Sequence, residues 1–108
     1  MKLLFWRNNR KIDGFAHALA EELYSHVLPE VARDYYKGVP QKNKKLQRKV
    51  EQKFAAVFEQ MRRFISANAL GIYGKARLQQ SFGDRLKELG YDVAVADGVV
   101  ETFLLSNG

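Results

Sequence analysis

The longest amphipathic pattern in the chain lies between about residues 42 and 70, and it constrains the fold more than any other feature. Apolar residues recur there at spacings of mostly three and four, namely Leu46, Val50, Phe54, Val57, Met61 and Phe64, with Phe58 and Ile65 beside them. This periodicity predicts one apolar side of a long α-helix, which Gly71 and Gly74 end. Because globular helices average about 11 to 12 residues, we expect this one to be the spine of the domain.

A second apolar pattern precedes it, between residues 13 and 38. It repeats every four residues, at Phe15, Leu19, Leu23, Val27 and Val31. The pattern predicts a helix with Asp13 as its N-cap and Gly38 as its stop. Pro29 lacks a backbone N–H, so it is expected to kink or divide this helix near Ser25.

Two shorter segments follow. The first segment predicts a third helix, because its apolar residues share one face and Gly90 stands at the C-terminal capping position. The residues on that face are Leu78, Phe82, Leu86 and Leu89. Residues 92–106 fit two structures, because Asp97-Gly98 between β-branched residues is typical of a β-hairpin. The alternative is a fourth helix with Val99, Val100, Phe103 and Leu104 on one face. We favour the helix, because a lone two-stranded hairpin is only marginally stable in water.

Length and composition limit the fold class. A chain of 108 residues with 46% hydrophobic residues is long enough for one core and too short for two. We therefore predict a single all-α domain over residues 1–108, a small bundle of three or four helices. No stretch reaches the length of a transmembrane helix. The absence of cysteine excludes disulfides and thiolate chemistry and fits a reducing compartment, so we expect a cytoplasmic protein.

The segment QKNKKLQRKV, residues 41–50, carries five basic side chains in a chain of net charge +6. A rotation of about 100° per residue places Lys45, Arg48 and Lys49 opposite the apolar stripe. We expect this face to meet the phosphate backbone of DNA or RNA, where affinity comes from counterion release. The expected contacts are Lys42, Lys44, Lys45, Arg48, Lys49 and Lys53. The alternative is a solvated lysine-rich face that only keeps the protein soluble.

Two further features extend the nucleic-acid hypothesis. Arg77 and Gln80 lie in the first turns of the third predicted helix, and their side chain types suit guanine and adenine edges in a major groove. With Gly71 in the connection, the second and third helices would then form a helix-turn-helix. Tyr36, next to the basic stretch, suits stacking on unpaired bases.

A different class of function is suggested by the apolar start of the chain. Leu4, Phe5 and Trp6 precede basic residues, and three uses stay open for them: packing on the bundle, contact with a membrane surface, or docking on a partner. The alternative function is therefore a protein–protein interaction or assembly module. It would dock on another chain, or on a second copy as a homodimer, through these residues or the wide stripe of the long helix.

Catalytic and metal-binding patterns are weak. No nucleophile elbow or phosphate-binding loop is present, so we predict no enzyme, no catalytic residue and no cofactor. His17 and His26 lie on opposite sides of a straight helix, and their acidic neighbours at four-residue spacing are typical of ordinary surface electrostatics. We therefore predict no metal site. The sequence favours a small non-catalytic binding module.

Overall fold

The structure, a computed structural model, describes residues 2–38 and 43–107, with side chains for residues 8–38 and 43–104. Within these ranges it contains helices and no strand. The helices are α1 (Lys2–His26), α2 (Pro29–Tyr36), α3 (Lys44–Ala67), α4 (Ile72–Glu88) and α5 (Val93–Asn107). The all-α prediction is confirmed. The prediction of three or four helices is wrong, because Pro29 divides the first predicted helix into α1 and α2.

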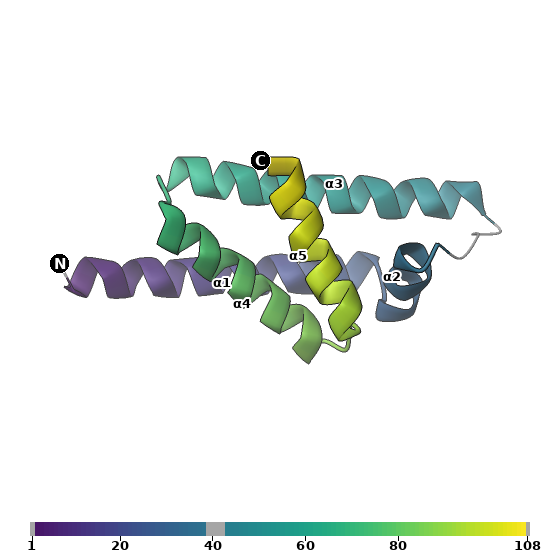
Figure 1. The fold of residues 1–108 in the computed structure, drawn as a ribbon, viewed down its shortest axis with the longest axis horizontal. Coiled ribbons are helices and arrows are strands. Elements are labelled where there is room, and N and C mark those ends of the chain that lie inside the picture. The colour runs from purple at the N-terminus through teal and green to yellow at the C-terminus, as the bar shows by residue number, and fades with distance from the viewer. Residues whose placement is uncertain (1, 39–42, 108) are drawn as a thin grey trace.

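The helices form an elongated bundle of 53 × 25 × 20 Å. Figure 1 shows α1 and α3 running in opposite directions along the long axis, with α4 crossing α1. From the end of α4, α5 runs across the bundle to α3 (Figure 1), where the rings of Phe103 and Phe58 lie 5.7 Å apart between centroids. The first turns of α1 extend past the ends of α3 and α4.

The core draws side chains from all five helices, and α3 supplies the predicted stripe. Its buried residues are Val50, Phe54, Val57, Phe58 and Met61. Burying such a side chain contributes about 1.5–3 kcal/mol relative to leaving it exposed. These five residues of the predicted stripe therefore belong to the core, whereas Leu46, at the start of the stripe, is 39% exposed.

The first helix begins earlier than the sequence predicts. Asp13 does not cap α1, which starts at Lys2. The carboxylate of Asp13 instead accepts hydrogen bonds from Arg77 and Ser81 of α4. The apolar face of the helix also continues toward the N-terminus through Ile12, which is fully buried.

The β-hairpin alternative for residues 92–106 is wrong, because this segment lies in α5. A Cβ atom on Gly98 would come within 3.3 Å of the Tyr36 ring, and one on Gly83 would come within 3.3 Å of Val100. Both glycines therefore serve close helix packing. Gly98 is a contact site for α2 and Asp97 pairs with Lys87 of α4, although the Asp97-Gly98 sequence is typical of a turn.

Glycine ends α2 and α4 as predicted. Gly38 has φ 70° and Gly90 has φ 105°, the left-handed region that suits a residue without Cβ. At the end of α4, the N–H of Tyr91 donates to the Leu86 carbonyl and that of Gly90 donates to the Lys87 carbonyl, both at 3.1 Å. These two bonds form a Schellman motif.

The end of α3 differs from the prediction. The left-handed residue is Ala69, with φ 49°, and it lies two positions before Gly71. The N–H of Leu70 donates to the Ile65 carbonyl at 3.0 Å, so the same capping motif forms here on a residue with a Cβ. A left-handed conformation costs an L-residue about 1–2 kcal/mol, which makes Ala69 a strained position.

Replacing this alanine with glycine should stabilise the protein. We expect Ala69→Gly to raise the free energy of unfolding by about 0.5–1 kcal/mol, since relief of strain exceeds the entropic cost of glycine. Urea denaturation at equilibrium measures the change. The matched control is Ala56→Gly in the exposed middle of α3, which should lower the free energy of unfolding by about 1 kcal/mol. Equal losses in both variants would contradict the strain at Ala69.

Candidate nucleic-acid interface

Basic side chains open α3. Asn43 caps the helix, its side-chain oxygen accepting a hydrogen bond from the backbone N–H of Lys45 at 3.0 Å, and the first turn contains no acidic residue. The N-terminus of a helix carries partial positive charge, so a cation there is unfavourable by about 0.3–1 kcal/mol. The stability of α3 therefore does not explain why Lys44 and Lys45 stand at its start.

Four of the predicted phosphate contacts are exposed together on the first turns of α3. They are Lys44, Lys45, Arg48 and Lys49, here called the basic face. None of them forms an ion pair among the residues that the structure describes. Lys53 differs, because its ammonium donates to Glu22 of α1 at 3.1 Å and its side chain is 16% exposed. Lys42 lies outside the described residues.

The basic face consists of two parallel stripes, each of which leads to a groove. Lys45 and Lys49 lead to a groove of about 460 Å³ between α1 and α3, and Lys49 lines it together with His26, Leu46, Val50, Gln52, Lys53 and Ala56. Lys44 and Arg48 lead to a groove of about 390 Å³ that we call the aromatic groove. Its lining residues are Tyr35, Tyr36, Glu51, Phe54, Ala55, Phe58 and Thr102.

Three aromatic rings in contact form one wall of the aromatic groove. Tyr35 stacks on Phe54 with centroids 5.8 Å apart, and Tyr36 meets Phe54 edge to face at 5.7 Å. Both tyrosines are partly buried. Burial is the largest cause that raises the pKa of each hydroxyl, although a hydrogen bond with Thr102 opposes it at Tyr36. Both hydroxyls therefore stay protonated and neutral at physiological pH.

Arg77 lies far from the basic face and joins two helices. Its Nε and Nη2 atoms donate to the two carboxylate oxygens of Asp13 at 2.9 and 2.7 Å, and Ser81 donates to the same carboxylate at 2.5 Å. The hydrogen bond from Arg77 is the largest cause that lowers the pKa of Asp13 below its ordinary value of 3.8, while burial opposes it. Arg77 thus has its donors engaged in fixing α4 on α1.

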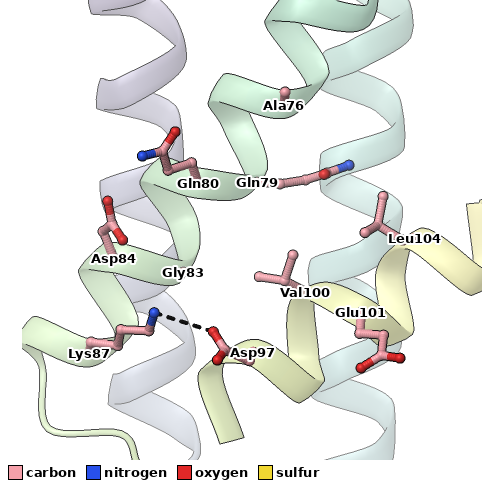
Figure 2. Close-up of a pocket in the computed structure, with 10 residues that line it drawn as sticks. All are labelled: Ala76, Gln79, Gln80, Gly83, Asp84, Lys87, Asp97, Val100, Glu101 and Leu104. Carbon is pink, nitrogen blue, oxygen red and sulfur yellow. Dashed lines mark ion pairs between the residues drawn. The ribbon is translucent and has the colours of Figure 1, made fainter. Parts of the chain in front are cut away.

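Gln80 lines a third groove, of about 410 Å³, between α4 and α5 (Figure 2). Figure 2 shows Gln80 pointing away from α5 and an ion pair between Lys87 and Asp97, with nitrogen and oxygen 3.2 Å apart. Asp84 and Glu101 also line this groove, so it carries more negative than positive charge. Such a surface repels phosphates.

The structure does not bring Arg77 and Gln80 together with the basic face. The start of α3 and the start of α4 lie at opposite ends of the bundle, and α4 packs mainly on α1 (Figure 1). In a helix-turn-helix, by contrast, the recognition helix packs on the helix before it. Sequence reasoning could not detect this, because the Arg77 partner Asp13 is 64 positions away.

Leu4, Phe5 and Trp6 lie in the first turns of α1, and their side chains lie outside the described residues. In the part of the chain that the structure describes, no three histidine, aspartate or glutamate side chains are arranged to hold a metal ion. None of the helices over those same residues combines the length and the apolar character that a membrane crossing requires.

The Asp13–Arg77 pair predicts a pH-dependent contribution to stability. Because folding lowers the pKa of Asp13, its contribution is complete above about pH 5 and is lost as the pH falls through the folded-state value, below 3.8. We expect Asp13→Asn to be less stable than the wild type at pH 7, with a gap that closes toward pH 2. Urea denaturation across this range measures the gap, and Asp84→Asn is the control. A gap that stays constant with pH would contradict the assignment.

Comparison with known proteins does not assign the chain to a family. No family model, no curated protein and no solved structure matches it. The residues and geometry described above therefore carry the functional argument alone.

Proposed function

We propose that the protein is a small non-catalytic binding module that associates with nucleic acid through the basic face of α3. One observation carries the proposal: Lys44, Lys45, Arg48 and Lys49 are exposed together on the first turns of α3, and Lys44 and Lys45 stand in the first turn, where positive charge is unfavourable for the fold. The absence of cysteine supports a cytoplasmic location for this activity.

The proposal implies a definite dependence on salt. Each phosphate neutralised by a lysine or arginine releases condensed counterions, which lowers log K by about 0.9 per unit of log salt concentration on duplex DNA. Four contacts give a slope of about −3.6, so the affinity should fall about a hundredfold between about 50 and 200 mM salt. A solvated face that only promotes solubility shows no such binding.

Two double variants of α3 test the proposal at equal net charge. Lys45→Gln with Lys49→Gln removes two cations from the basic face, and it should weaken oligonucleotide binding and reduce the salt slope by about two. Arg62→Gln with Arg63→Gln removes two cations that pair with Glu59 near the other end of the same helix. This control should leave affinity and slope unchanged. Fluorescence anisotropy with labelled oligonucleotides measures both quantities.

Equal losses of binding affinity in the two double variants would show that net charge alone drives the association. That result would contradict the assignment of binding to the basic face. Failure of the wild type to bind at about 50 mM salt would remove the nucleic-acid function altogether. Circular dichroism verifies that each variant keeps its helices.

A protein–protein interaction module is the second candidate. The observation that favours it is the extension of α1, whose first turns carry Leu4, Phe5 and Trp6 past the ends of α3 and α4 (Figure 1). Five residues of the α3 stripe are buried, so this candidate depends mainly on the end of α1.

Association through this end of α1 should respond to salt and to substitutions differently from nucleic-acid binding. In light scattering after size exclusion, we expect a dimer that persists at high salt, since apolar contacts do not weaken as phosphate contacts do. Phe5→Ser with Trp6→Ser should convert it to a monomer with its helicity intact, whereas Lys45→Gln with Lys49→Gln should leave the dimer unchanged. A monomeric wild type would contradict self-association.

A further inference from the structure

The aromatic groove continues one stripe of the basic face. Lys44, Arg48, Glu51 and Ala55 stand at positions i, i+4, i+7 and i+11 of α3, and all four are exposed. Residues at these spacings lie on one side of a helix. Glu51 and Ala55 also line the aromatic groove, which is therefore about 10 Å or less along the helix axis from Arg48.

The lining of the aromatic groove suits a flat aromatic ligand. The rings of Tyr35, Tyr36 and Phe54 form one wall, in which the tyrosines are partly exposed and Phe54 is 5% exposed, and Glu51 supplies a carboxylate beside them. A volume of about 390 Å³ is larger than one nucleobase and falls in the range of about 300–1,000 Å³ found for ligand pockets. Every base has a π-face, so bases of any nucleotide sequence can stack on aromatic side chains. A carboxylate accepts a hydrogen bond from the amino group of cytosine.

Charge distinguishes between the two ligand classes that aromatic side chains and a carboxylate attract. An organic cation is favoured by the ring faces and by Glu51. However, the four cations of the basic face lie within about two turns of Glu51, and they would repel an organic cation. A nucleotide gains from both features, because its phosphate meets Lys44 or Arg48 while its base meets the rings. The surroundings therefore favour the nucleotide.

We infer that the aromatic groove takes an unpaired base from a single-stranded nucleic acid whose phosphates lie along Lys44 and Arg48. This inference rests on the proposed function and deepens it, because it selects single strands over duplexes. In a duplex the bases are stacked and paired, so only the phosphate contacts remain.

Three ligands of about 12 nucleotides separate base contacts from phosphate contacts: a single strand of cytidines, an abasic strand of the same length, and a duplex. We expect the cytidine strand to bind the wild type at least about tenfold more tightly than the abasic strand. The difference should disappear in Ala55→Leu, which fills the mouth of the aromatic groove. It should persist in Ala56→Leu, an equally exposed neighbour that lines the α1–α3 groove.

A second readout does not depend on any variant. Amide chemical shifts of Ala55 and Thr102 in the wild type should move with the cytidine strand and stay in place with the abasic strand. Equal affinity for both strands, with binding still weakened by Lys45→Gln and Lys49→Gln, would overturn this inference and leave the proposed function standing. No binding of any ligand at about 50 mM salt would overturn both.

Discussion

The seating of α4 on α1 is the most extensive helix contact of the described bundle. Leu78 and Leu86 are fully buried in it, and two charged contacts set its register: Arg77 with Asp13, and Arg85 with Glu21 at 2.7 Å. Partly exposed pairs of this kind contribute little free energy. They are directional, however, and the apolar contacts beneath them are not. Burial thus supplies the stability of the α1–α4 contact, and the ion pairs define which residues face each other.

This arrangement separates the two sides of α3. One side fills the core with Val50, Val57 and Met61, while the other side presents the basic face to solvent. Lys53 stands at the border and is held by Glu22 of α1. A nucleic-acid partner would therefore approach a rigid helix whose orientation the core has already fixed, which limits the conformational entropy lost on binding.

The features that the sequence predicts correctly are local. The α3 stripe, the break at Pro29 and the stops at Gly38 and Gly90 follow from periodicity and backbone chemistry within a few residues. The features that it misses depend on distant partners. Arg77 is engaged because Asp13 lies on another helix, and Gly98 lies within α5, where Tyr36 of α2 packs closely against it. The candidate site also has a local part and a part that depends on distant residues. The exposure of the basic face was predictable from the sequence, whereas the aromatic groove beside it forms only where α2, α3 and α5 meet.

The cations at the start of α3 have a consequence for thermodynamic linkage. Lys45 and Lys49 stand one turn apart and repel each other, and Lys45, in the first turn, is also repelled by the helix dipole. Any polyanion that neutralises them removes this repulsion only while α3 is folded. If the proposed nucleic-acid partner binds there, occupancy and folding are coupled, and binding would raise the stability of the bundle. The charge that makes the free helix less stable is the same charge through which the proposed partner would stabilise it.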